Sequence, residues 1–254
     1  DVLKPSGGSF QLFDEEPSEK HRQQIGTLLE TPNFYHYLSA VNNLKIAAAI
    51  KGRGLEDIDH VLETVNLYQR KHSRFNTYSL GMKQRLAIAS CLLGNPEVMV
   101  FDEPTNGLDP VGIAEIRDLI RRLHRAGKTI IMASHLLDEV EKVCTHVAII
   151  QKGVLKTVGS VAELMHTGIV DAEATILIEI SAADNAALKN TIGQFDGVLS
   201  VSEVDRDLHL LCSDTGESIN RMCFEKGIIL NKLNVKRKSL ETRFLEITGK
   251  QSVN

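Results

Sequence analysis

Two adjacent carboxylates, Asp102 and Glu103, follow a short apolar run in the segment EVMVFDEPTNGLD at residues 97–109. Open α/β sheets bind ligands at the carboxyl ends of their parallel strands, which is where such a run would deliver this pair. Asp102 is a hard oxygen ligand that suits Mg²⁺. Glu103 could position and polarise a water that attacks a γ-phosphate. The plainer alternative is an acidic strand end followed by a proline turn.

A candidate anion site lies in the segment YSLGMKQRLAIA, residues 78–89. Ser79 is a natural N-cap for a helix, and Gly81 would lie in the first turn. The unpaired backbone N–H groups of a helix N-terminus attract anions, and a glycine lets a phosphate approach the backbone. The alternative is an ordinary capped amphipathic helix.

A third candidate is His135, in the segment TIIMASHLLDEVE at residues 129–141. The apolar run at 129–133 predicts a buried strand, so we expect His135 on the same sheet edge as Asp102 and Glu103. From there it could donate a hydrogen bond to a γ-phosphate or to an attacking water. A purely structural histidine at a strand end is the alternative.

The elements that must position these residues are predicted from hydrophobic periodicity. Near-continuous apolar runs at 97–101, 129–133 and 146–151 predict strands buried on both faces. An amphipathic helix is expected from Pro110 to about Ala126, because Asp109 can cap its start and Gly127 suits its end. Strand–helix–strand repetition of this kind predicts a parallel α/β sheet.

The flanking regions predict two further parts. A short strand at 25–29 leads into a mostly helical region, and a strong helix is expected at 79–93. Beyond residue 173 the pattern becomes β-α-β-β-α-β, the order of a small split-βαβ unit. The strands are expected at 173–180, 198–204, 208–213 and 228–236, the helices at 185–195 and 217–226, and a closing helix at 240–248.

Composition narrows the function classes. The chain has 254 residues and a net charge of −4, so nothing in its charge favours a nucleic-acid partner. No apolar run approaches the roughly 20 residues that cross a bilayer. The four cysteines form no CxxC pair, which favours reduced thiols over a metal site.

Taken together, the three motifs resemble the ATP-binding subunits of ABC transporters over about residues 1–165. FDEP resembles the Walker B element with its catalytic glutamate, and YSLGM stands where the LSGGQ signature stands. NGLD resembles the D-loop, and ASH resembles the switch-histidine motif.

The resemblance implies a RecA-like P-loop NTPase core, incomplete in this chain, with a helical subdomain. It also implies ATP and Mg²⁺ as cofactors. It implies ATP hydrolysis coupled to transport by two copies that sandwich two ATPs. The subunit would bind a transmembrane permease at the cytoplasmic face of the membrane. The implied site residues are Glu103 and His135 for catalysis, Ser79, Gly81, Met82 and Asp109 for ATP, and Asp102 and Glu30 for the metal.

The chain departs from the family pattern at two places. The signature reads SLGM in place of SGGQ, so Leu80 and Met82 could alter the phosphate contact. Glu30 stands where most of the family has a glutamine. This substitution resembles the variant found in bacitracin- and lantibiotic-resistance exporters and their relatives. A carboxylate is a competent Mg²⁺ ligand; an exposed strand-end carboxylate is the alternative. The aromatic cluster at residues 34–37 either packs against a helix of the membrane subunit or fills the helical subdomain.

A phosphate-binding loop of the form GxxxxGK[ST] is the element we do not find. The only GK[ST] triplet, Gly127-Lys128-Thr129, follows a predicted helix, and Arg122 stands where the first glycine belongs. We therefore expect a chain that is N-terminally truncated, with its Walker A absent, and unable to hydrolyse ATP alone.

The predicted domains are an ABC ATPase domain at 1–168, with its helical subdomain at about 31–94, and an accessory α+β domain at 169–254. The accessory domain resembles one that is appended to drug- and peptide-export ATPases, where dimer contact and regulation are both open as roles. Two other functions stay open for the chain: a non-transport ABC-type ATPase that acts on ribosomes or DNA, and a non-catalytic regulatory fragment.

Overall fold

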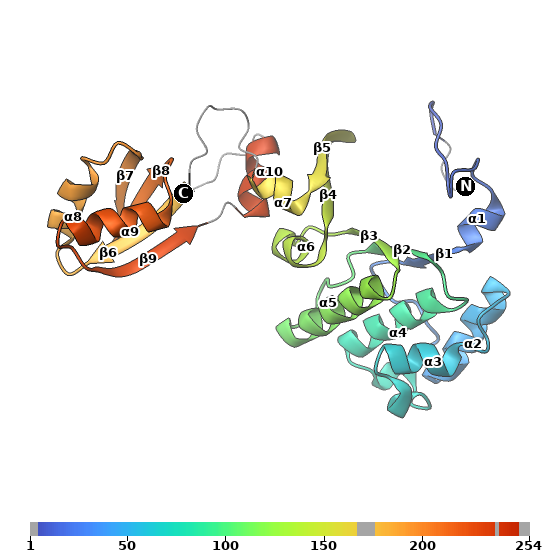
Figure 1. Cartoon of the computed structure of the whole chain (residues 1–254). Helices are drawn as coiled ribbons and strands as arrows, with labels where there is room; N and C mark the ends of the chain where they lie inside the picture. Colours follow the sequence, from blue (N-terminus) through green and yellow to red (C-terminus); the bar gives the residue numbers. More distant parts are fainter. Residues whose placement is uncertain (1–4, 167–175, 237–238, 249–254) are drawn as a thin grey trace. The chain divides into compact units, whose positions relative to one another are not determined.

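The computed structural model describes residues 5–166, 176–236 and 239–248. It divides into two compact units, residues 1–136 and 137–254 (Figure 1). The predicted domains, 1–168 and 169–254, stay a prediction, since they divide the chain at a different residue. No helix in the described ranges is both long and apolar enough to cross a membrane.

A parallel three-stranded sheet organises the first unit. Its strands are β1 (Ile25–Leu28), β2 (Val98–Asp102) and β3 (Thr129–Ala133), in the order β1-β2-β3. Leu28 pairs with Phe101 on the neighbouring strand, and Asp102 pairs with Ala133. The parallel sheet predicted for the segments at 97–101 and 129–133 is therefore confirmed.

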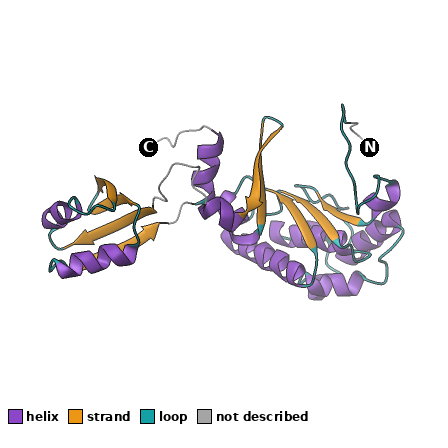
Figure 2. Ribbon diagram, turned by 45° about the horizontal axis from the view of Figure 1, so that its top comes forward, coloured by secondary structure: helices purple, strands orange, loops and turns teal. Residues whose placement is uncertain are grey.

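Helices pack against one face of this sheet (Figure 2). The sheet is contacted by α1 (Glu19–Gln23), α4 (Leu80–Leu92) and α5 (Pro110–Arg125). A further layer packs on α4 and consists of α2 (Ala40–Lys51) and α3 (Ile58–Thr64). Two 3₁₀ turns, η1 (Tyr68–Arg70) and η2 (Phe75–Thr77), lie in the same region of the chain. The mostly helical region expected ahead of β2 is thus present. The core under the sheet is made of fully buried side chains, among them Leu86, Ile88, Met99, Phe101, Ile116 and Leu119.

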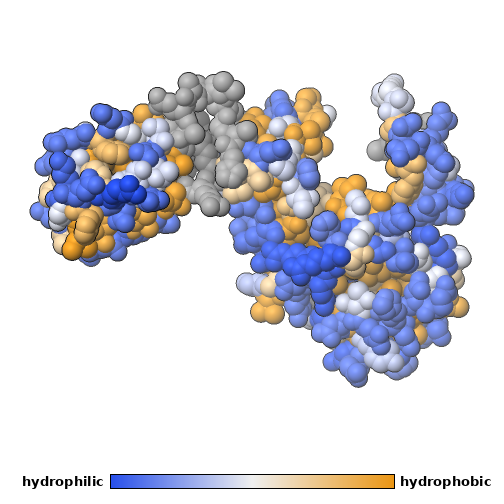
Figure 3. Space-filling model, viewed as in Figure 1, coloured by the Kyte–Doolittle hydropathy of each residue, from blue (hydrophilic) through white to orange (hydrophobic). Residues whose placement is uncertain are grey.

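The prediction that β2 and β3 are buried on both faces is wrong for the described residues. Along β2, Met99 and Phe101 are fully buried, but Val100 between them is 36% exposed. On β3, Ile131 is 58% exposed. The physical reason is that α4 and α5 cover one face only, so every second side chain points away from them. Hydrophobic surface, drawn in orange, accordingly lies over this part of the sheet in Figure 3.

A half-buried lysine and a buried cysteine connect α2, α4 and β1. Lys51, the last residue of α2, donates through Nζ to the carbonyl oxygen of Ser90 at 2.6 Å. The Cys91 thiol donates to the carbonyl oxygen of Thr27 on β1 at 2.9 Å. Burial raises the pKa of Cys91 to about 12, so this thiol stays protonated and remains a donor. The Ser90 carbonyl oxygen also accepts from the N–H of Leu93 at the end of α4, so Lys51 adds a second donor there.

The prediction that the segment at 146–151 belongs to the parallel sheet is wrong. The segment forms β4 (His146–Gln151), which pairs antiparallel with β5 (Val154–Ser160) in a separate two-stranded sheet. Lys152 and Gly153 both have positive φ, at 51° and 76°. Two such residues in succession make the tight turn that favours a hairpin over a crossover.

Three helices complete this part of the second unit: α6 (Leu137–Val143), α7 (Val161–His166) and α10 (Leu240–Thr248). The closing helix predicted at 240–248 is present, and it packs against α6 and α7. Leu240 is fully buried, and Arg243 donates through Nε to the carbonyl oxygen of Leu164 at 2.8 Å.

The split-βαβ order predicted for the last part of the chain is confirmed. It contains β6 (Ile176–Ala182), α8 (Asn185–Ile192), β7 (Val198–Val204), β8 (Asp207–Cys212), α9 (Gly216–Glu225) and β9 (Leu230–Lys236). Each adjacent pair is antiparallel, in the order β7-β8-β6-β9. Its own core consists of Ile178, Ile180, Leu188, Ile192, Leu208, Leu210, Cys212, Ile219 and Cys223.

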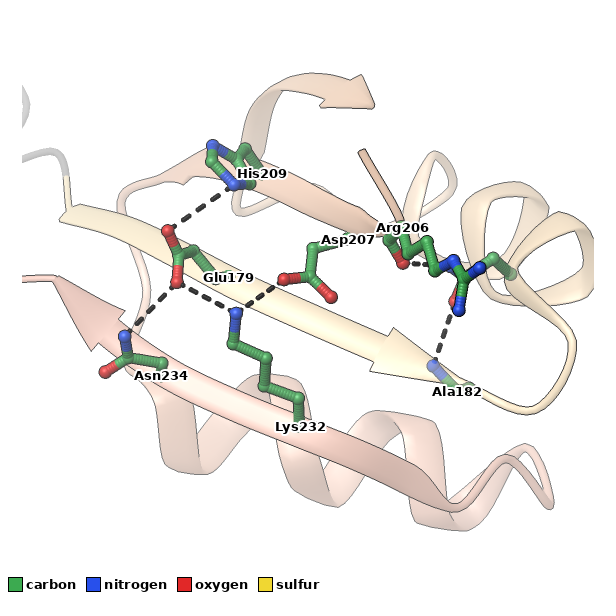
Figure 4. A network of polar contacts seen from close by, with 8 residues as sticks. Glu179, Ala182, Arg206, Asp207, His209, Lys232 and Asn234 are labelled. Atoms are coloured by element: carbon green, nitrogen blue, oxygen red, sulfur yellow. Dashed lines mark hydrogen bonds and ion pairs between the residues drawn. The ribbon is translucent and has the colours of Figure 1, made fainter. Parts of the chain in front are cut away.

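An ion network lies on the face of this sheet opposite its hydrophobic core (Figure 4). Glu179 of β6 is only 6% exposed, between the core residues Ile178 and Ile180. Its carboxylate contacts His209 at 3.4 Å, and Lys232 and Asn234 at 3.2 Å each. These cross-strand partners compensate the buried charge, which would otherwise be costly.

The close approach of β1 to α4 gives a stability prediction. A methyl group on Gly26 would lie 2.6 Å from the Cys91 carbonyl oxygen, a distance that forces the backbone to move. Gly26→Ala should therefore destabilise the first unit by about 1–3 kcal/mol, measured as a lower urea midpoint. Gly7→Ala is the matched control, because nothing lies within 4 Å of that added methyl group. Equal midpoints for the two variants would contradict the packing described.

Candidate functional site

The carboxyl ends of β2 and β3 place the predicted residues side by side. In the pairing of β2 with β3, Asp102 lies opposite Ala133. The N–H of the following residue, Glu103, donates to the Ala133 carbonyl oxygen at 3.0 Å. Glu103 has φ of +46°. Such a conformation is uncommon for a residue other than glycine, and it is found preferentially at functional sites. The chain therefore turns sharply at the residue predicted to do chemistry.

Glu103 and His135 hold each other through two hydrogen bonds. The His135 backbone N–H donates to Glu103 Oε1 at 3.0 Å, and His135 Nδ1 lies 2.9 Å from Glu103 Oε2. A carboxylate only accepts, so Nδ1 carries the proton in this pair. The Glu103 side chain is 21% exposed and that of His135 is 63% exposed. The pair is thus fixed in geometry and open to a ligand on the histidine side.

This arrangement constrains what each group can do. Each Glu103 oxygen keeps a second lone pair, so the carboxylate can still accept a hydrogen bond from a water. With Nδ1 donating to Glu103, the neutral ring offers Nε2 as an acceptor, and Nε2 donates only when the ring is protonated.

Asp102 has a free carboxylate. It is exposed, and it forms no hydrogen bond or ion pair with any residue in the described ranges. The same ranges hold no group of three or more His, Cys, Asp or Glu side chains that could bind a metal ion by themselves. Mg²⁺ commonly takes one or two carboxylates and completes its shell with waters and substrate phosphates. The available donors fit that mode of binding, and they do not form an all-protein cage.

Glu30 has a partner that the sequence did not indicate. Asn106 donates through Nδ2 to Glu30 Oε1 at 2.6 Å. Glu30 lies just beyond β1, and Asn106 lies in the loop that follows β2. The structure therefore brings Glu30 to the loop that carries Glu103.

The signature residues stand at the start of α4. Ser79 is its N-cap, and its Oγ accepts a hydrogen bond from the N–H of Met82 at 3.3 Å. Asp109 caps α5 in the same way, accepting from the N–H of Gly112 at 2.8 Å. The two helix starts are neighbours, since a methyl group on Gly81 would lie 3.9 Å from Gly112 Cα.

Within the described residues, no hydrogen bond or ion pair joins the signature residues to the pair at the strand ends. The structure thus groups Glu103 with His135, and it groups Ser79, Gly81 and Met82 with the start of α5 at Asp109. The neighbouring helix starts were not foreseen, because they depend on how α4 and α5 pack.

A groove of about 510 Å³ lies between the loop after β1 and the helix α2. The aromatic cluster beside it divides in two. Phe34 packs edge-on against the buried Phe75, with ring centroids 5.3 Å apart, so it fills the helical region. Tyr35 and Tyr37 are 52% and 67% exposed and remain free to meet another molecule. The groove is lined by Thr27, Leu28, Leu29, Thr31, Pro32, Asn33, Phe34, Tyr35, Asn43, Ile46, Ala47, Ile50, Ala87 and Ser90.

The Gly127-Lys128-Thr129 triplet is the turn from α5 into β3, as its sequence context indicated. Gly127 has φ of +90°, and Lys128 Nζ donates to Asn95 Oδ1 at 2.6 Å. It lies at the opposite end of β3 from Asp102 and Glu103.

A parallel sheet flanked by helices, with an acidic pair and a histidine at its carboxyl edge, defines the class as an α/β protein. The comparisons with known proteins identify the family. The family model described as "ABC transporter" matches residues 2–106. The chain is 39% identical over 253 residues to an ABC transporter ATP-binding protein of Bacillus subtilis, YhcH, and the match covers 98% of this chain and 80% of that protein. It is 35% identical to the bacitracin transport ATP-binding protein BcrA of Bacillus licheniformis, with 98% and 81% covered.

Among solved structures, the chain is similar to cbiO1 of Clostridium perfringens, described as part of the ABC transporter complex cbiONQ. The TM-score is 0.57 at 30% identity, with 64% of this chain and 70% of that chain covered. The chain belongs to the family of ABC transporter ATP-binding proteins, which are ATPases coupled to transport, and it has their RecA-like P-loop NTPase fold.

The double contact between Glu103 and His135 can be tested by hydrogen exchange. Glu103→Ala removes the acceptor of the His135 amide, so that amide should exchange about three- to tenfold faster, as expected for the loss of one hydrogen bond. Glu97→Ala is the control, because the exposed Glu97 side chain forms no hydrogen bond or ion pair with a described residue and its backbone carbonyl remains. Unchanged exchange at His135 in the first variant would rule out the contact.

Proposed function

We propose that the transporter that contains this chain hydrolyses Mg-ATP with Glu103 as the residue that activates the attacking water, and that hydrolysis drives export of a peptide antibiotic or another amphiphile. The observation that carries the proposal is the Glu103–His135 pair at the carboxyl ends of two parallel strands. Ligands of open α/β sheets bind at this edge.

The role of Glu103 follows from its fixed position. His135 holds both oxygens of the carboxylate, which keeps the side chain from turning to other donors. Each oxygen retains a lone pair to accept a proton from water. His135 serves as the positioning partner, and when its exposed ring is protonated, Nε2 can donate to the terminal phosphate.

Asp102 and Glu30 are the residues proposed to hold Mg²⁺. Bound between these carboxylates and the ATP phosphates, the ion would neutralise charge on the phosphates. Asp102 supports this role because its carboxylate is exposed and unpaired within the described residues. Glu30 keeps one oxygen free, since Asn106 contacts only Oε1.

A second copy of the subunit is proposed to complete each ATP site. Ser79, Gly81 and Met82 form the first turn of α4 and its cap, apart from the strand ends of their own chain. Backbone N–H groups at a helix start bind phosphate. These residues would therefore contact ATP held mainly by the other copy, with Asp109 at the adjoining helix start between the two sites.

A transmembrane permease is the proposed partner for the groove beside α2. The groove is partly apolar, and the exposed rings of Tyr35 and Tyr37 lie next to it. Exposed aromatic and apolar groups at a concave surface favour protein binding. Binding there would hold the subunit at the cytoplasmic face of the membrane as a peripheral protein.

The cargo is proposed from likeness to BcrA, whose description names bacitracin transport. Glu30 agrees with this branch, since it replaces the glutamine common elsewhere in the family. The C-terminal split-βαβ domain is proposed as an accessory part of the subunit, following the predicted division at residue 169.

The proposal predicts the behaviour of Glu103→Gln in the transporter that contains this chain. The amide keeps the shape but cannot take a proton from water, so ATP should stay bound with turnover lowered by about 100-fold or more. Trapped ATP should also hold two copies of the subunit together in size-exclusion chromatography. Glu97→Gln is the control and should hydrolyse at the parent rate. Full turnover by Glu103→Gln would remove Glu103 from the mechanism.

A further inference from the structure

Asn106 contacts two residues that the proposed function treats separately. Its backbone N–H donates to the carbonyl oxygen of Glu103 at 3.2 Å, and its side-chain Nδ2 donates to Glu30 Oε1 at 2.6 Å. Glu30 and Asn106 are 76 residues apart in the chain. Asn106 thus joins the loop after β1 to the residue that turns the chain after β2.

We propose that Asn106 is a positioning residue, which holds the Glu30 carboxylate at the end of β1 and ties its loop to the loop at 103–109. The link itself needs no ligand, whereas its consequence for Mg²⁺ rests on the proposed function of Glu30.

The sheet explains why the two loops meet. Leu28 of β1 and Phe101 of β2 are paired in register, so the loops that follow leave the sheet as neighbours. The second loop is stiffened from within, because the N–H of Leu108 donates to the carbonyl oxygen of Thr105 at 3.3 Å. A side chain on such a loop is a defined anchor, unlike one on a freely moving segment.

The chemistry of the pair favours an amide at position 106. An asparagine offers N–H donors to a carboxylate acceptor, and a donor to a charged acceptor makes a stronger bond than a neutral pair. Occupying Oε1 also leaves Oε2 as the oxygen available for a cation. An aspartate at 106 would place two carboxylates in contact, and like charges at that distance repel.

The test exchanges the two groups of the pair. Asn106→Asp alone, Asn106→Ala alone, and Asn106→Asp combined with Glu30→Gln are compared with the parent chain by hydrogen exchange of peptides 29–35 and 103–109. Each single variant should speed exchange in both peptides by about three- to tenfold. The exchanged pair should return both peptides to within about twofold of the parent, because the amide now at position 30 can donate to the carboxylate now at position 106.

Asn76→Asp is the control for the charge change. The Asn76 side chain is exposed and has no partner in the described residues, and the substitution adds the same single negative charge. Its exchange in peptides 29–35 and 103–109 should match the parent.

Faster exchange in the single variants with recovery in the exchanged pair supports the link. Unchanged exchange in both single variants, or failure of the exchanged pair to recover, would overturn it. Failure of the proposed function would look different. Glu103→Gln would then turn over ATP freely while the exchange pattern of the Asn106 variants stayed as described.

Discussion

The in-register pairing of β2 with β3 is the constraint on which the candidate site depends. It ends at Asp102 opposite Ala133 and is continued by one further hydrogen bond, from the N–H of Glu103 to the Ala133 carbonyl oxygen. A slip of one residue would turn Glu103 to the other face of the sheet. Such a slip would move Met99 and Phe101, both fully buried against the helices, out of the core. The packing of the core therefore determines where Glu103 lies.

The loop after β2 carries most of what the site needs. Its first residue, Glu103, has a strained backbone and a side chain held twice by His135. Its middle residue, Asn106, reaches Glu30, and its last, Asp109, caps α5. Glu103 stays in this strained backbone conformation because its backbone N–H and its side chain are both held by hydrogen bonds. One short loop therefore connects the end of β1, the end of β3 and the start of α5.

The sequence predicted the strand ends and helix caps well because these are local signals. An apolar run before Asp102 and the serine before α4 each identify one position without reference to the rest of the chain. The Glu30–Asn106 bond could not be predicted, because it depends on the register of β1 and β2. The prediction for β4 was wrong for a local reason, because two residues with positive φ, at positions 152 and 153, turn the chain back into a hairpin. The exposure of every second residue on β2 and β3 depends on which face of the sheet the helices cover. A continuous hydrophobic run in the sequence does not indicate whether one face or both faces are covered.

Glu103 and His135 act as one unit, and the ring tautomer of His135 is the property that depends most closely on their contact. Nitrogen-15 NMR of the purified chain distinguishes a protonated Nδ1 from a protonated Nε2. Neutral His135 should carry its proton on Nδ1, where it donates to Glu103, and the proton should move to Nε2 in Glu103→Ala. A proton on Nε2 in the parent chain, or no change in the variant, would contradict it.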